Sequence, residues 1–164
     1  MSKFIIAVYV ENKAGVLTRV TGMFTRRGFN IDTLTVGETE RREFSRITIC
    51  MSGDAYVKEQ MINQLKKLVV VKKVEVLDEE ATKRELMLIK VQNASEHRSD
   101  IMTAVDVFRA SVIDYSPESM CIEVTGSPSK MDAFVALMKP FGILEMCRTG
   151  IVALERGSQT LLTK

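Results

Sequence analysis

A short stretch near the start of the chain has residue types that suit the binding of a small anion. It runs from Glu11 to Leu17 (Glu-Asn-Lys-Ala-Gly-Val-Leu) and follows an apolar run at residues 4–10. A helical pattern starts directly after it, so we expect residues 12–15 to form a turn between a strand and a helix. The first N–H groups of a helix lack partners and carry the positive end of its dipole. Gly15 has no side chain there, which leaves room for a carboxylate.

The same pattern has a purely structural interpretation. Asn12 can add an amide hydrogen bond to a ligand, but Asn-x-x-Gly turns more often only make a corner and cap a helix. From this stretch alone the structural interpretation is the more common one, and both stay open.

No arrangement of residues in the sequence indicates an enzyme. His97 lies in a hydrophilic stretch at an expected helix start, and we find no nucleophile elbow, phosphate-binding glycine loop or dinucleotide fingerprint. The cysteines, Cys50, Cys121 and Cys147, are odd in number and include no Cys-x-x-Cys pair, so neither a disulfide framework nor a metal site is expected. They suit small buried hydrophobic positions in a reducing compartment. Only Cys147, beside Arg148, has a neighbour that could activate a thiol.

Composition indicates a globular chain with one or two small domains. The chain has 164 residues, of which 46% are hydrophobic and 27% charged, and a net charge of +2. It has neither a run long enough to span a membrane nor a signal-peptide pattern, so we expect a cytoplasmic protein with no membrane partner. A nucleic-acid partner is not expected either, because the strand predicted at 44–52 offers Ile, Thr and Met instead of stacking aromatic residues.

Hydrophobic periodicity predicts a ferredoxin-like unit in the first half of the chain. The order is strand, helix, strand, strand, helix, strand, which is a split β-α-β arrangement. Gly28 is expected to stop the first helix, and Asp54 to cap the second. The predicted elements are a strand at 4–10, a helix at 15–27, strands at 30–39 and 44–52, a helix at 55–67 and a strand at 69–77.

The second half repeats this order, so we predict an α+β fold with two ferredoxin-like (βαββαβ) domains. The domains are expected at 1–77 and 85–157, joined by an acidic linker at 78–84 and followed by a frayed polar tail at 158–164. The second set comprises a strand at 85–92, a helix at 96–110, strands at 111–116 and 120–126, a helix opening at Ser127-Pro128 and ending at Gly142, and a short strand at 151–154.

Several motifs together resemble a known family. Glu11-Asn12-x-x-Gly15-Val16-Leu17, Phe24-x-x-Arg27-Gly28-Phe29-Asn30-Ile31 and Leu34-Thr35-Val36-Gly37 are similar to the ACT domain of the acetolactate (acetohydroxyacid) synthase small, regulatory subunit. The resemblance continues in register through Arg84-Glu85-Leu86-Met87-Leu88-Ile89-Lys90-Val91, Lys130-Met131-Asp132-Ala133-Phe134 and Arg148-Thr149-Gly150. It therefore covers nearly the whole chain.

The resemblance implies a regulatory role. Small subunits of this kind form homodimers through the N-terminal domain and bind a branched-chain amino acid, usually valine, at the dimer interface. They also bind a catalytic large subunit, which carries thiamine diphosphate, Mg²⁺ and FAD, and raise its activity, while the effector lowers that activity by feedback. This chain itself is expected to hold no cofactor and no catalytic residue.

The resemblance also implies an effector site. Helix-start N–H groups would take the α-carboxylate, and asparagine side chains and strand carbonyls the ammonium, while burial of the isopropyl group contributes about 1.5–3 kcal/mol. One methylene is worth only about 1–3 kcal/mol in such a pocket, so the residues do not distinguish valine from isoleucine or leucine. The expected residues are Asn12, Ala14, Gly15, Val16 and Leu17 on one protomer, Asn30, Thr35, Val36 and Gly37 from the same protomer or its neighbour, and Gln60 nearby.

A competing class of function is a free-standing amino-acid sensor or a regulator of transcription. A transcription regulator would need a DNA-reading element, and no helix-turn-helix pattern is apparent in the sequence.

Overall fold

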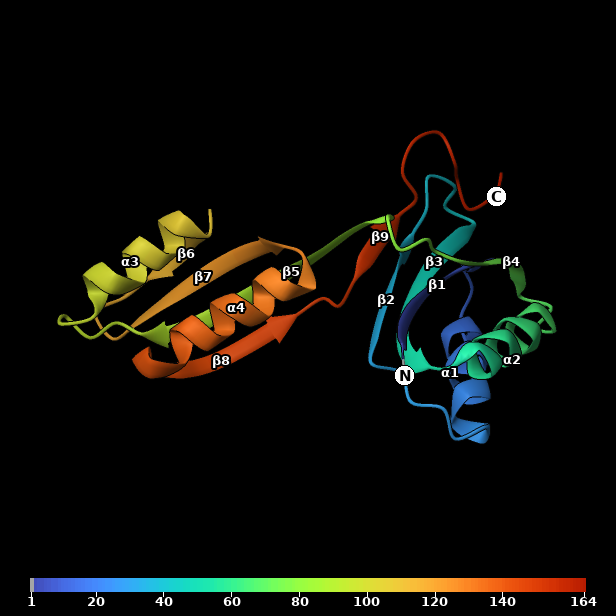
Figure 1. Ribbon diagram of the computed structural model, residues 1–164, viewed down its shortest axis with the longest axis horizontal. Coiled ribbons are helices and arrows are strands. Elements are labelled where there is room, and N and C mark those ends of the chain that lie inside the picture. The colour runs from blue at the N-terminus through green and yellow to red at the C-terminus, as the bar shows by residue number, and fades with distance from the viewer. Residues whose placement is uncertain (1) are drawn as a thin grey trace. The chain divides into compact units, whose positions relative to one another are not determined.

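The computed structural model describes residues 2–164, which form two compact units (Figure 1). The first unit contains the chain up to Thr82 together with Ile151–Lys164, and the second contains Lys83–Gly150. The segment that follows residue 150 therefore belongs to the first unit. This differs from the prediction, which placed residues up to 157 in the second domain.

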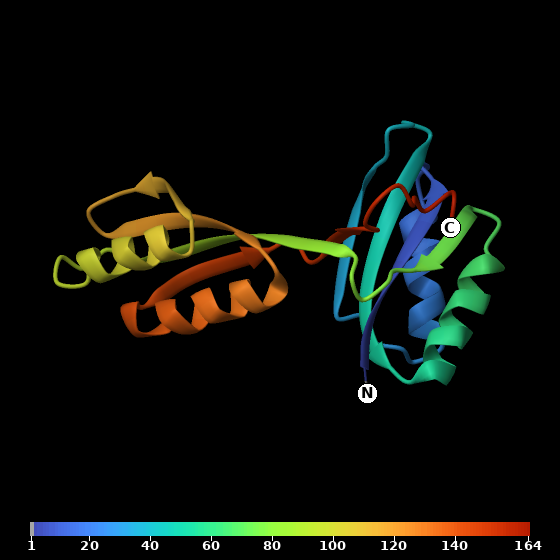
Figure 2. The ribbon, with the colours of Figure 1, turned by 45° about the horizontal axis from the view of Figure 1, so that its top comes forward.

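The first unit is a four-stranded antiparallel sheet with two helices on one face (Figure 2). Its strands lie in the order β2-β3-β1-β4, which confirms the predicted ferredoxin-like topology. The elements are β1 (Ser2–Glu11), α1 (Val16–Arg26), β2 (Thr33–Glu38), β3 (Phe44–Gly53), α2 (Ala55–Lys66) and β4 (Val71–Val76).

The apolar run of β1 is continuous because both faces of this central strand are buried. Ile6 and Val8 pack against the helices, whereas Ala7 and Tyr9 point to the opposite face and pack in a separate cluster. The helices begin and end where the sequence predicts. The carboxylate of Asp54 caps α2 by accepting from the N–H of Val57 at 2.8 Å, as expected of an N-cap aspartate.

The second unit repeats the topology with its own core. Its strands lie in the order β6-β7-β5-β8, all antiparallel, and its helices pack on one face around Met87, Ile89 and Phe134. The elements are β5 (Thr82–Gln92), α3 (Arg98–Val107), β6 (Ser111–Tyr115), β7 (Ser119–Gly126), α4 (Pro128–Met138), a 3₁₀ turn η1 (Lys139–Phe141) and β8 (Ile143–Arg148).

The prediction missed β8. Gly142, with φ of 85°, makes the turn into this strand, whose residues show no clear alternation of polar and apolar side chains. The short strand expected at 151–154 exists as β9 (Val152–Leu154), which pairs with β5 beside the main strand order of the second sheet. Of the three cysteines expected to be buried, Cys50 is buried, Cys121 is half-buried, and Cys147, on β8, is exposed, so the expectation is confirmed only for Cys50.

The C-terminal tail is ordered by contacts that the sequence did not suggest. Leu161 is only 7% exposed and packs with Ile5 and Tyr9 on the sheet face away from the helices. Lys164 forms ion pairs with Asp78 and Glu155. The prediction of a frayed tail at 158–164 is therefore wrong. The predicted linker is also shorter than expected, because β5 already begins at Thr82.

Among the described residues, no helix is long and apolar enough to cross a membrane.

Candidate functional site

The N-terminus of α1 is open. Gly15 is its N-cap residue, with φ of 81°, and no side chain within residues 2–164 caps the helix. The N–H of Val16 reaches back to the carbonyl of Lys13 at 3.3 Å, and the first helical bond runs from Arg19 to Gly15 at 3.1 Å. A Cβ atom built at Gly15 would meet no atom within 4 Å. The helix start therefore presents N–H groups, with the positive end of its dipole, to free space.

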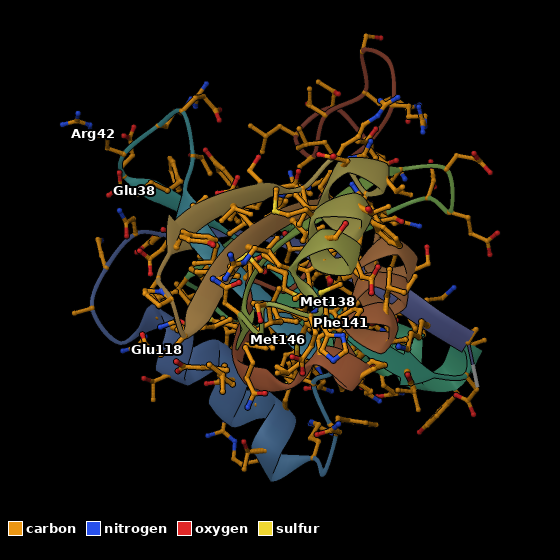
Figure 3. All side chains as sticks on the ribbon, turned by 90° about the vertical axis from the view of Figure 1, so that its left-hand side faces the viewer. Glu38, Arg42, Glu118, Met138, Phe141 and Met146 are labelled. Carbon is orange, nitrogen blue, oxygen red and sulfur yellow. The ribbon has the colours of Figure 1, made fainter. Side chains whose placement is uncertain are left out.

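Asn12 holds this loop against the turn that joins β2 and β3. Its Nδ2 donates to the carbonyl of Arg42 at 2.8 Å and to Oε1 of Glu38 at 3.2 Å, and its backbone N–H donates to Glu43 at 2.8 Å. Figure 3 shows Glu38 and Arg42 at this turn. Both protons of the Asn12 amide are thus used within the chain, so its Oδ1 is the atom left to meet a ligand donor.

Glu38 is a candidate site residue that the sequence analysis missed. It is exposed, follows Gly37 directly and places a carboxylate beside Asn12. A carboxylate at this point can accept hydrogen bonds from the ammonium of an amino acid. The available signal was its position directly after the Leu34–Gly37 motif, as an acidic residue at the end of the strand.

Two lysines neutralise the remaining acid of the loop. Lys72 Nζ lies 2.7 Å from Oε1 of Glu11, and Lys13 Nζ lies 3.1 Å from Oε2. These bonds, the one from Lys72 first, lower the pKa of the Glu11 carboxyl below its usual 4.5. The pairs are solvent-exposed and add little stability, but they neutralise Glu11, the only acid in residues 11–15.

The apolar residues of the predicted site differ in their exposure. Val16, the first residue of α1, is 5% exposed and anchors the helix in the core. Leu17 and Val36 are 43% and 41% exposed. Val36 lies in register with Ile47, a core residue, and therefore points to the helix side of the sheet. Leu17 and Val36 are thus available for an apolar ligand group. Ala14 is exposed in the loop itself.

The rest of the predicted strand points away from the helices. Thr35 and Gly37 alternate with Val36 and so occupy the opposite face of β2. Thr35 is half-buried, and Gly37 is exposed with open space where a side chain would stand.

Asn30 and Gln60 are not brought to the loop within one chain. Asn30 precedes β2, whose first residue, Thr33, pairs with Cys50, which in turn pairs with Ile5. Asn12 lies seven positions beyond Ile5, just past the other end of β1, which is roughly 20–25 Å along a strand. Gln60 is half-buried on α2, and no hydrogen bond within residues 2–164 joins it to the loop.

The two halves of the chain match two family models. Residues 6–73 match the AHAS small subunit-like ACT domain, and residues 84–157 match the model described as small subunit of acetolactate synthase. The chain is 51% identical to a probable acetolactate synthase small subunit of Archaeoglobus fulgidus, over 96% of this chain and 99% of that one. It is 44% identical to the Bacillus subtilis acetolactate synthase small subunit, over 96% and 92% of the two chains.

A solved structure agrees with these matches. The crystal structure of an acetolactate synthase small subunit from Thermotoga maritima aligns with a TM-score of 0.91 at 40% identity, over 97% of this chain and all of that one. The chain belongs to the acetolactate synthase small-subunit family. The predicted family and its ACT domain are thereby confirmed.

The second unit of this small subunit contains a buried ion pair. Glu85 is 3% exposed and accepts hydrogen bonds from Nε of Arg148, at 3.1 Å, and from Nη2. Nη1 of Arg148 donates to the exposed Asp132 at 2.7 Å. Burial alone lowers the pKa of Arg148, but the bonds to Glu85 and Asp132 outweigh it and raise that pKa. The resemblance had noted Glu85, Asp132 and Arg148 without a role, and in the structure they join β5, α4 and β8.

Metal binding finds no support in the described part of this small subunit, where no group of three or more His, Cys, Asp or Glu side chains is placed to hold an ion.

Proposed function

We propose that this chain is the regulatory subunit of acetolactate synthase and has no catalytic site of its own. It raises the activity of a catalytic large subunit, which carries thiamine diphosphate, Mg²⁺ and FAD. It also makes that activity subject to feedback inhibition by a branched-chain amino acid, for which we propose valine. The observation that carries the proposal is the match to acetolactate synthase small subunits along nearly the full length of both chains.

The open start of α1 suits one end of an amino acid. Its N–H groups take the α-carboxylate in front of Gly15, where the structure has free space. Oδ1 of Asn12 and the carboxylate of Glu38 accept from the ammonium. Leu17 and Val36, both partly exposed, meet the branched side chain.

The site is completed by a second copy of the chain. β2 is an edge strand of the sheet, and an edge strand is a ready template for pairing. Antiparallel pairing of two β2 strands about a twofold axis places the start of one strand beside the end of the other. Asn30 of the partner subunit then lies near the loop that contains Asn12, although the two positions are roughly 20–25 Å apart within one chain.

Inhibition requires that the effector binds one arrangement of the regulatory dimer better than another, because equal binding to both would shift nothing. We propose that valine at this interface changes how the dimer acts on the large subunit. A ligand this small binds no tighter than about micromolar, roughly −8 kcal/mol, which suits the sensing of a metabolite pool.

The test is Gly15→Asp, assayed as the reconstituted holoenzyme. The aspartate places bulk and negative charge where the carboxylate of valine binds, so we expect valine inhibition to be lost while the small subunit still raises large-subunit activity. Gly15→Ala is the matched control, because it meets the same positive φ, 81°, and the same open space around the Cβ position without adding a charge, so valine inhibition should persist.

The outcomes separate the parts of the proposal. Normal valine inhibition of Gly15→Asp would show that the site is assigned wrongly. A wild-type chain that neither co-purifies with the large subunit nor changes its activity would overturn the regulatory-subunit role and favour a free-standing sensor.

A further inference from the structure

The outer face of the first sheet, away from α1 and α2, is covered by the C-terminal strap, which we define as residues 151–164. Ile151, Ala153 and Leu161 are each less than 9% exposed and pack against β1 residues such as Ala7 and Tyr9. The strap is therefore part of the hydrophobic structure of the first unit. It is also the segment by which the chain returns from the second unit at Gly150.

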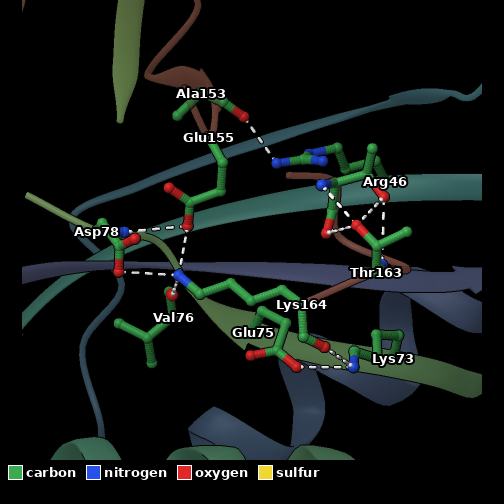
Figure 4. Close-up of polar contacts among 10 residues, drawn as sticks. Arg46, Lys73, Glu75, Val76, Asp78, Ala153, Glu155, Thr163 and Lys164 are labelled. Atoms are coloured by element: carbon green, nitrogen blue, oxygen red, sulfur yellow. Dashed lines mark hydrogen bonds and ion pairs between the residues drawn. The ribbon is translucent and has the colours of Figure 1, made fainter. Parts of the chain in front are cut away.

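One ammonium group joins the two chain segments that lead to and from the second unit. Lys164 Nζ lies 2.8 Å from Oδ1 of Asp78 and 2.6 Å from Oε1 of Glu155, and it donates to the carbonyl of Val76 at 3.2 Å (Figure 4). The N–H of Asp78 donates to the same Glu155 oxygen at 3.1 Å. Asp78 lies on the outgoing segment and Glu155 on the returning one. We call this group of Asp78, Glu155 and Lys164 the clasp.

The clasp depends on its lysine. The Glu155 side chain is only 4% exposed, and a carboxylate so far removed from water is costly unless it is paired. The hydrogen bonds to Asp78 and Glu155 raise the pKa of Lys164 above its usual value, so the ammonium stays charged. Loss of this charge would leave the buried Glu155 carboxylate with the backbone N–H of Asp78 but no cation, and would release the strap.

Arg46 links the strap to the proposed effector strand. It lies on β3, in register with Gly37 of β2 on one side and Tyr9 of β1 on the other. Its Nη2 donates to the carbonyl of Ala153 at 2.7 Å, three residues after the chain leaves the second unit. A displacement of β2 can therefore be transmitted to the strap through β3 and the hydrogen bond between Arg46 and Ala153.

The contacts of Arg46 are incomplete in this arrangement. Its Nε and the hydroxyl of Tyr9 are buried, and neither has a hydrogen-bond partner within residues 2–164. Burial lowers the pKa of the Arg46 guanidinium, and the charge of Glu155 opposes that effect. Buried donors without acceptors favour a rearrangement that supplies acceptors. The hydrogen bond from Arg46 to the carbonyl of Ala153 is therefore the contact of the strap that is most easily displaced.

We propose that Arg46 and the clasp transmit effector binding from β2 to the two chain segments that hold the second unit. This inference rests on the proposed function, in that β2 is taken as the effector strand. Arg46 acts as a positioning residue, because it acts on the strap without touching the effector. Valine binding strengthens or weakens the hydrogen bond from Arg46 to the carbonyl of Ala153. The strap, which is continuous with the second unit at Gly150, transmits this change to the second unit.

The first test follows the strap in the wild-type holoenzyme by hydrogen exchange. We expect saturating valine to change the protection of residues 151–156 at least threefold, and to have no such effect in Arg46→Met, which keeps the apolar stem and removes the donors. Equal protection with and without valine in the wild type would overturn the inference.

The second test separates binding from response. Arg46→Met and Lys164→Met are expected to bind valine within about threefold of wild type by calorimetry, yet to show less than half of the wild-type inhibition at saturating valine. Arg46→Lys retains a donor and should recover part of the inhibition, a recovery that loss of packing alone would not produce. Lys66→Met, at an exposed end of α2, is the matched control for loss of a positive charge.

The outcomes distinguish failure of the role of Arg46 and the clasp from failure of the proposed function. If wild-type protein binds valine and Arg46→Met and Lys164→Met are inhibited as fully as wild type, only the role of Arg46 and the clasp is overturned. If wild-type protein does not bind valine, isoleucine or leucine, the proposed function is overturned and this inference with it.

Discussion

Nδ2 of Asn12 lies 3.2 Å from Oε1 of Glu38, so the ends of β1 and β2 are held together although 26 positions separate the two residues in the chain. This contact places the side chain of Asn12 and a carboxylate together, three residues before Gly15 at the uncapped start of α1. The pair offers acceptors for an ammonium, and the helix start offers donors for a carboxylate. The two groups of a zwitterion thereby find complementary partners close together.

We therefore expect Glu38→Gln to weaken valine binding. A hydrogen bond between charged groups contributes about 1.5–3 kcal/mol, which corresponds to roughly a 10- to 150-fold increase in the dissociation constant. Calorimetry with the purified chain measures this directly. Glu40→Gln is the matched control, since Glu40 is an exposed acid in the same turn. Equal affinities of the two variants would place the ammonium elsewhere.

The elements of the first unit were predictable because their signals are local. The apolar stripe of α1 and the cap at Asp54 each depend on residues within a few positions of one another. The loop from Asn12 to Gly15 was found for the same reason. Glu38 was missed because its place beside Asn12 depends on the pairing of β1 with β3, which brings Glu11 opposite Phe44 and which no local signal around Glu38 encodes.

The order of the strap could not be predicted from local sequence either. Residues 158–164 are mostly polar, and composition alone predicts an unattached tail. Their order depends on Lys164 meeting Asp78, 86 positions away, and on Leu161 meeting the outer face of β1. That face was itself hidden in the sequence, because a strand buried on both sides shows only a continuous apolar run.

We expect Val36→Lys to keep the chain monomeric under conditions in which the wild type forms the proposed dimer. Val36 lies at 41% exposure on the edge strand through which we propose that two copies pair, and a lysine there brings two positive charges into the interface. Sedimentation at a fixed protein concentration reports the change, and valine binding should fall in parallel because the site draws on both copies.

Val69→Lys serves as its control. Val69 is 85% exposed just before β4, at the opposite edge of the sheet. It should leave the dimer intact. A monomeric Val69→Lys beside a dimeric Val36→Lys would move the interface to the β4 edge.

Arg148→Met is expected to destabilise the second unit by about 2–3 kcal/mol, because it leaves the carboxylate of Glu85 buried without its partner. Glu85→Leu combined with Arg148→Met should recover most of this loss, since apolar residues can replace a buried ion pair at little cost. Asp132→Asn should change stability by less than about 1 kcal/mol, because Asp132 is 70% exposed.

Hydrogen exchange at the amides of β5 and β7 in the full chain is the measurement for this pair, because it reports the second unit separately from the first. A single global unfolding free energy is not well defined for a chain with two units. If the double variant is no more stable than Arg148→Met, the loss comes from the packing of the arginine stem between β8 and its neighbours and not from the unpaired charge of Glu85.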